Sequence, residues 1–229
     1  MLYALRHPVA LVALLAAFVL GVTVRGFVQA RLSARFGDRS GLAAGRGSLD
    51  PRRHLDPFGA VAAALSGVGW GHPVERPSYV RPGQRGRILA VLLAGPVAVA
   101  ILGALFLGGY AAIGGPAGLG QAGVVPATLH ATYLPENAAQ TLLLFAGIEL
   151  VAMAVLALIP LPPLDGGRIL FLYAPRTPGW QKAEYHLAEQ NIGTAILLAL
   201  LLIPITGQDP LLLFLLDLIV YPLLRLVSL

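Results

Sequence analysis

The sequence of 229 residues contains no cysteine and few charged residues. The first shortage excludes certain bonds and metal sites, and the second argues against a soluble domain. A chain without cysteine can form neither a disulfide nor a thiolate metal site. Charged residues account for 12% of the chain, compared with about 25% in a typical soluble domain. Hydrophobic residues account for 57%, and the mean hydropathy is +0.77. These values predict an integral membrane protein.

Lysine is almost absent as well, because Lys182 is the only one and every other basic residue is an arginine. This bias, together with abundant alanine, glycine and proline, indicates a GC-rich bacterial genome and hence the bacterial plasma membrane. The net charge of +5 could suggest nucleic-acid binding. The basic residues are concentrated in one loop, however, where they more simply set the orientation of a membrane protein. We therefore expect membrane lipids and no nucleic acid as partners.

Five segments are predicted to cross the bilayer, since a crossing takes about 20 apolar residues. The apolar stretch 57–70 is only 14 residues long and is interpreted as re-entrant or interfacial. The sequence thus predicts one all-α membrane domain over residues 1–229, with about five transmembrane helices and a re-entrant or hairpin segment near 40–80. The predicted crossings are 8–30, 88–114, 136–160, 191–206 and 211–228.

Arginine is distributed unevenly over the loops between these crossings. The loop 31–87 carries most of the arginines, 115–135 has neither lysine nor arginine, and 168–190 has two arginines and one lysine. The positive-inside rule then predicts that 31–87, 168–190 and the C-terminus are cytoplasmic and that the N-terminus lies outside. The arginines of the first loop are Arg31, Arg35, Arg39, Arg46, Arg52, Arg53, Arg76, Arg81, Arg85 and Arg87.

Several short motifs rich in glycine, proline and aspartate follow one another along the chain. They are 35–38; 49–59 with His54, Asp56 and Pro57; 69–74; Ala94 with Gly95 and Pro96; and 159–170 with Pro162, Pro163, Asp165, Gly166 and Gly167. In this order they resemble motifs of the site-2 protease family of intramembrane zinc proteases, over residues from about 20 to 175. The resemblance implies a membrane helix bundle in which Asp165 stands at the position of a zinc ligand.

The other zinc-binding residues of that family are missing. Where the family carries His-Glu-x-x-His, the chain has Arg25, Gly26 and Gln29. Arginine is always protonated and cannot donate a lone pair, glycine has no side chain, and a glutamine amide is a poor zinc ligand. Family asparagines are also replaced, at 97–99 and at Ala157. The resemblance therefore implies a pseudoprotease without catalytic residues, and we expect no zinc and no other cofactor.

The remaining carboxylate can be interpreted in two ways. Asp165 is either a hydrated side chain near a helix end, or the partner of Arg25, whose guanidinium would replace the metal and bind the carboxylate through two hydrogen bonds. We favour the pair, because the resemblance points both side chains at one centre. The alternative for Arg25 is an extended side chain that reaches the cytoplasmic headgroups.

Further polar residues allow weaker hypotheses. Glu149 lies inside a predicted crossing, where a carboxylate is costly, and Asp217 and Arg225 fall on roughly one face of the last one. A relocated zinc site could use His54, His72 and Asp165, but His54 and Asp56 belong to a loop motif and are expected to be structural. His130 and His186 show no ligand spacing with the other histidines.

Three classes of function follow, in order of preference. The first is a non-proteolytic site-2-protease-like protein that acts as a scaffold, a regulatory subunit or a binder of transmembrane helices, within a larger membrane complex. The second is an active intramembrane zinc metalloprotease with unorthodox ligands, which metal content would distinguish. The third is a transporter or channel-like subunit, which a hydrated path through Glu149, Asp217 and Arg225 would favour.

Overall fold

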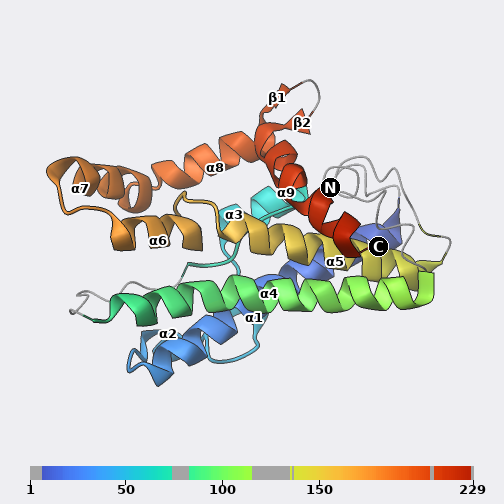
Figure 1. Ribbon diagram of the computed structural model, residues 1–229, viewed down its shortest axis with the longest axis horizontal. Helices are drawn as coiled ribbons and strands as arrows, with labels where there is room; N and C mark the ends of the chain where they lie inside the picture. The colour runs from blue at the N-terminus through green and yellow to red at the C-terminus, as the bar shows by residue number, and fades with distance from the viewer. Residues whose placement is uncertain (1–6, 74–82, 115–134, 136, 207–208, 228–229) are drawn as a thin grey trace.

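The computed structural model describes residues 7–73, 83–114, 135, 137–206 and 209–227. Within this part the protein is almost entirely helical, and its longest helices run along the longest axis of the molecule (Figure 1). The elements are α1 (Pro8–Arg35), α2 (Ser40–Ala43), the 3-10 turn η2 (Pro51–Arg53), α3 (Pro57–Ser66), α4 (Arg85–Gly114), α5 (Ala138–Ala157), α6 (Asp165–Tyr173), α7 (Pro178–Glu184), the π-helical turn η5 (Tyr185–Glu189), α8 (Ile192–Leu202), β1 (Pro204–Thr206), β2 (Asp209–Pro210) and α9 (Leu211–Val227).

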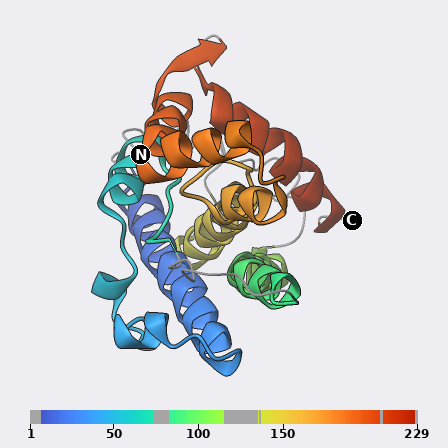
Figure 2. The same ribbon diagram turned by 90° about the vertical axis from the view of Figure 1, so that its left-hand side faces the viewer.

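Among the described residues, the three helices α1, α4 and α5 are long and apolar enough to cross a membrane. With 28, 30 and 20 residues and a rise of about 1.5 Å per residue, each can cover a hydrocarbon core of roughly 30 Å. Each packs against the other two, and α5 also contacts α9. Viewed along the bundle, α5 therefore lies between the α1–α4 pair and the C-terminal helices (Figure 2). The predicted all-α membrane fold is confirmed.

The first helix continues past its predicted end at residue 30 and reaches Arg35, since no helix-breaking residue comes before Gly37. Gly37 has a φ of +99°, which ends the helix in a left-handed conformation. The following carboxylate, that of Asp38, accepts hydrogen bonds from the hydroxyl and N–H of Ser40 and from the hydroxyl of Ser33. Burial raises the pKa of Asp38, but these hydrogen bonds outweigh it and hold the pKa below its usual value.

The apolar stretch 57–70 is divided into a helix and an extended segment. Helix α3 begins at Pro57 behind Asp56, whose carboxylate accepts a hydrogen bond of 2.8 Å from the N–H of Gly59 and so caps the helix. It ends after 10 residues, too few to cross a bilayer. The chain then turns back, and Gly71 forms an antiparallel bridge with Leu55. A position of α3 inside the bilayer stays a prediction.

The C-terminal part contains shorter helices than the two predicted crossings. The segments 191–206 and 211–228, predicted as two crossings, contain α8 with 11 residues and α9 with 17. Both helices are shorter than the helices that qualify as membrane spans by length. Between them β1 and β2 form a small antiparallel pair, which is the only strand pairing among the described elements. The two apolar runs of the C-terminal part therefore do not by themselves determine how many times this part crosses the membrane.

The long helices approach one another closely at glycines. A Cβ added at Gly147 of α5 would lie 2.7 Å from the side chain of Leu107 and 3.1 Å from its backbone nitrogen, on α4. At Gly21 of α1 it would lie 2.9 Å from the sulfur of Met153. In lipid, helices associate through such close packing rather than through the hydrophobic effect, because the surrounding lipid tails are equally apolar.

We predict that Gly147→Ala destabilises the bundle by about 1–3 kcal/mol, the usual cost of overpacking. Gly108→Ala in α4 is the matched control, since a Cβ there meets nothing within 4 Å, and alanine is favoured over glycine in a helix by about 0.5–1 kcal/mol. Thermal unfolding in detergent should show a lower midpoint for Gly147→Ala and an equal or higher one for the control. Equal losses at both positions would contradict the close α4–α5 contact.

Candidate functional site

The structure brings Arg25 and Asp165 together in the interior of the bundle. The Nε of Arg25 donates a hydrogen bond to Oδ2 of Asp165, and its Nη2 donates to Oδ1, both at 2.7 Å. Arg25 is 5% exposed and Asp165 is fully buried. Two parallel charge-assisted hydrogen bonds are the strongest arrangement that a guanidinium and a carboxylate can adopt. The side chain of Arg25 points into the bundle, and Asp165 is closed off from solvent.

Gln29 completes this cluster from the next turn of α1. Its Nε2 donates hydrogen bonds to Oδ2 of Asp165 at 3.1 Å and to the backbone oxygen of Leu92 at 3.2 Å. Leu92 is four residues before Pro96, which has no N–H to donate to the Leu92 carbonyl. Gln29 therefore joins α1 to both α4 and α6. We call Arg25, Gln29 and Asp165 the polar cluster.

Asp165 is held in place by the turn that precedes α6. It is the first residue of that helix, where the positive end of the helix dipole favours a carboxylate. The turn runs through the cis Pro162–Pro163 peptide and folds tightly against the start of the helix. Only glycine fits at Gly166 and Gly167, because a Cβ at either would overlap the backbone of residues 158–162. These motif residues thus fix the position of the carboxylate.

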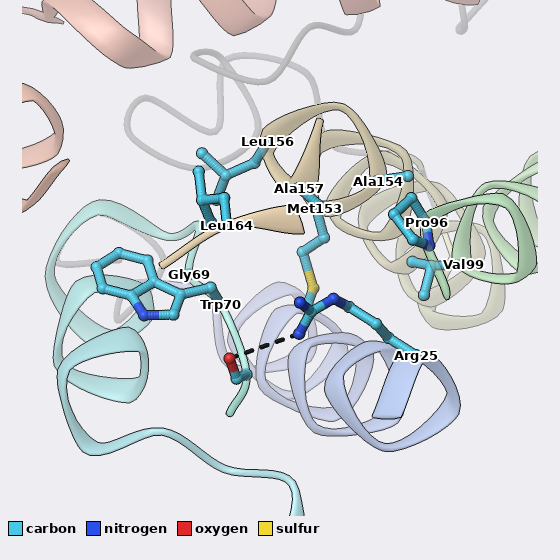
Figure 3. Close-up of a pocket in the computed structure, with 11 residues that line it drawn as sticks. Arg25, Gly69, Trp70, Pro96, Val99, Met153, Ala154, Leu156, Ala157 and Leu164 are labelled. Atoms are coloured by element: carbon cyan, nitrogen blue, oxygen red, sulfur yellow. Dashed lines mark hydrogen bonds between the residues drawn. The ribbon is translucent and has the colours of Figure 1, made fainter. Parts of the chain in front are cut away.

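The guanidinium also faces the extended segment after α3. Its Nη1 lies 3.5 Å from the carbonyl oxygens of Gly71 and His72, and Figure 3 shows the first of these contacts as a dashed line. Gly95 of α4 permits the close approach from the other side, since a Cβ there would lie 2.8 Å from Cγ of Arg25 and 2.7 Å from the amide of Gln29. Arg25 is therefore surrounded by α1, α4, α6 and the segment 69–72.

His54 covers the position next to Arg25. A Cβ added at Gly26 would overlap Nδ1 of His54. The other ring nitrogen, Nε2, lies 2.9 Å from the carbonyl oxygen of Ser48 and therefore carries the proton. Nδ1 is then a buried lone pair without a hydrogen-bond partner. Position 26 must therefore be glycine for steric reasons. It is also the position at which the resembled family carries its glutamate.

A small pocket adjoins Arg25 and has room for about one water molecule. Figure 3 shows that its walls come from α4, α5 and the segment 69–71, and Arg25 is the only charged side chain among them. A pocket of this size holds neither a metal with its ligands nor a peptide segment. The lining residues are Arg25, Gly69, Trp70, Gly71, Pro96, Val99, Met153, Ala154, Leu156, Ala157 and Leu164.

The residues at this centre do not fit a zinc ion. Both oxygens of Asp165 are bound by the guanidinium, and Gln29 directs its amide N–H, not a lone pair, toward the carboxylate. A zinc site takes at least three protein ligands with free lone pairs. Among the described residues there is also no group of three histidine, cysteine, aspartate or glutamate side chains that could hold a metal, which argues against a site made of His54, His72 and Asp165.

The side chains of the other polar candidates do not join the polar cluster. His72 is 3.9 Å from Asp56 through Nδ1, and His186 contacts Gln190 at the surface. Glu149 is fully buried in α5 with neither carboxylate oxygen hydrogen-bonded, and Asp217 is half-buried on α9. His130 and the side chain of Arg225 lie outside the described part of the chain.

The sequence did not indicate all of the contacts at the site. The role of Gln29 could have been inferred from its spacing of four residues after Arg25, which places both on one helix face. The availability of the Leu92 carbonyl as an acceptor for Gln29 could have been inferred from Pro96, which lies four residues later and has no N–H. Nothing in the sequence indicated that His54 packs on Gly26, because this contact joins a loop to a helix through the tertiary fold alone.

We predict that Arg25→Leu or Asp165→Leu alone lowers the stability of the protein by about 3–5 kcal/mol, because each leaves one buried charge unpaired. The double variant Arg25→Leu with Asp165→Leu should recover a good part of the loss. Thermal unfolding in detergent measures all three against the unchanged chain. If the two single losses simply add, the pair does not act as a unit.

Comparison with curated proteins identifies a relative in Bacillus subtilis. The chain is 30% identical over 210 residues, 88% of this chain and 85% of the relative, to the protein named "Putative zinc metalloprotease YwhC" from Bacillus subtilis (strain 168). No family model matches the chain, and no solved structure matches it. At this identity and coverage, the chain belongs to the metalloprotease-like family that includes the Bacillus protein.

Proposed function

We propose that this chain is a non-proteolytic, site-2-protease-like membrane protein. It would act as a scaffold, a regulatory subunit or a binder of transmembrane helices, within a larger membrane complex whose other subunits are its partners. The observation that carries the proposal is the bidentate contact of Arg25 with Asp165. A guanidinium stands beside the carboxylate that the family resemblance identifies as a metal ligand, so that the buried charge is balanced without a metal.

Loss of cleavage with retention of the fold is chemically simple at this centre. Hydrolysis by a zinc enzyme needs a bound water and a carboxylate that takes its proton. Here the carboxylate position is Gly26, and the imidazole of His54 packs on it. Gly95 permits the close approach of α4 to Arg25 and Gln29, and Gly166 and Gly167 permit the tight turn before Asp165. A scaffold can therefore persist although the catalytic chemistry does not.

An active zinc metalloprotease is the second candidate, and the name of the Bacillus relative favours it. It would need Arg25 to leave Asp165, and it would need ligands from elsewhere. The transporter hypothesis has less support, because the pocket beside Arg25 includes neither Glu149 nor Asp217. For the orientation, we propose that the arginine-rich loop 31–87 faces the cytoplasm, as its charge suggests.

We expect purified protein prepared without chelator to contain zinc well below one atom per chain, because one engaged carboxylate cannot replace three ligands. Metal analysis by mass spectrometry measures this directly, and cleavage of a transmembrane test substrate in proteoliposomes with added zinc measures activity. About one zinc per chain that is lost in Asp165→Ala, together with zinc-dependent cleavage, would restore the protease hypothesis.

Restoring the metal site provides the positive control. Arg25→His with Gln29→His supplies two imidazoles one helical turn apart and frees Asp165, so that this double variant should bind zinc. Adding Gly26→Glu should destabilise the protein, because the new side chain meets His54. A further His54→Ala change should relieve that loss. If the double variant folds but binds no zinc, α1 and α6 do not hold the geometry of a metal site.

A further inference from the structure

The two C-terminal helices are each too short to cross the membrane alone. At about 1.5 Å per residue, the 11 residues of α8 and the 17 residues of α9 cover about 17 Å and about 26 Å. The hydrocarbon core is roughly 30 Å thick. Laid end to end, however, the two helices are long enough for one crossing.

The direction of the two helices agrees with a single crossing. In Figure 1, α8 starts near α7 at one end of the long axis, and α9 carries on in the same general direction toward the other end. Two separate crossings would require α9 to return toward α7. Instead the end of α9 lies at the same end of the bundle as the beginning of α1, where the two chain ends are marked.

Local sequence explains why the crossing is interrupted. Pro204 has no N–H to continue α8, and Pro210 directly precedes α9. Between them β1 and β2 pair with each other, Pro204 opposite Pro210 and Thr206 opposite Asp209. Within a membrane, non-helical backbone needs such internal pairing or a protein or water environment. Pro204 and Pro210, which in the sequence suggest a loop between two crossings, are then part of a break inside one crossing.

Both halves have one face on protein and one face open to lipid. On α9, Leu212, Leu213, Leu216, Val220 and Leu224 are buried, and this helix contacts α5 and α8. Its other face exposes large apolar side chains along its length: Phe214, Leu215, Leu218, Ile219 and Leu223. An outer face of this composition belongs in hydrocarbon rather than in water. On α8, Leu197 and Leu201 are buried, and the helix packs on α3.

We propose that α8 and α9 form one interrupted membrane crossing. The chain then crosses the membrane four times, and its C-terminus lies on the same side as its N-terminus and opposite the arginine-rich loop 31–87. This replaces the cytoplasmic C-terminus that the apolar runs and the loop charges suggested. The charge distribution still obeys the positive-inside rule, since Arg225 and Arg6 are then the only arginine or lysine residues on the outer side.

Cysteine labelling can test this arrangement, because the chain has no cysteine of its own. One variant carries a single cysteine on a short flexible tail appended after Leu229. Two reference variants carry Leu49→Cys, at a residue that is 62% exposed in the arginine-rich loop, or Gly179→Cys in α7, where an added side chain meets nothing within 4 Å. A membrane-impermeant maleimide is applied to spheroplasts before and after permeabilisation, and labelling in denaturant measures the total thiol.

We expect the tail cysteine to react in intact spheroplasts, and Leu49→Cys and Gly179→Cys to react only after permeabilisation. The reverse result, with both references reacting in intact spheroplasts and the tail only after permeabilisation, also supports four crossings. It would mean that the whole chain has the opposite orientation. Equal accessibility of the tail and the references would overturn the proposal, because it means that α8 and α9 together cross the membrane either twice or not at all. This outcome is independent of the proposed function, because no step depends on the polar cluster.

Discussion

The ion pair between Arg25 and Asp165 is the interaction on which the arrangement of the bundle depends. Two opposite charges buried among helices are stable only when they meet each other with good geometry, because water is not available to solvate either. Here both hydrogen bonds are 2.7 Å long, and Gln29 adds a third donor to the carboxylate. The cluster therefore fixes how α1, α4 and α6 lie relative to one another.

The surrounding sequence follows from this requirement. Gly95 lets α4 approach the guanidinium, Gly166 and Gly167 let the turn fold onto α6, and Gly26 leaves room for His54. Each is a glycine because another residue's atoms occupy the place of its Cβ. The resemblance to a protease thus survives in the packing residues. The residues that differ from the family motif are Arg25, Gly26 and Gln29, at the positions that would contact the metal and its water. The positive charge of Arg25 takes the place of the charge of the metal ion.

Much of the fold followed from the sequence, since long apolar runs and breaking residues decide where α1, α4 and α5 lie. The pairing of Arg25 with Asp165 followed from a family resemblance, not from spacing, because 140 residues separate the two. The C-terminal crossings were less predictable. The apolar runs on both sides of 203–210 are compatible with one crossing or two, and only the direction of α9 distinguishes them. The contact of His54 with Gly26 had no local signal at all.

A density map of the protein prepared with zinc present would show directly whether Arg25 or a metal ion binds Asp165. We expect planar guanidinium density joined to Asp165 by two short contacts, and no zinc anomalous signal at this centre. A zinc peak bound to Asp165, with Arg25 displaced from the carboxylate, would contradict this expectation and would identify the chain as a metal enzyme with an unusual set of ligands.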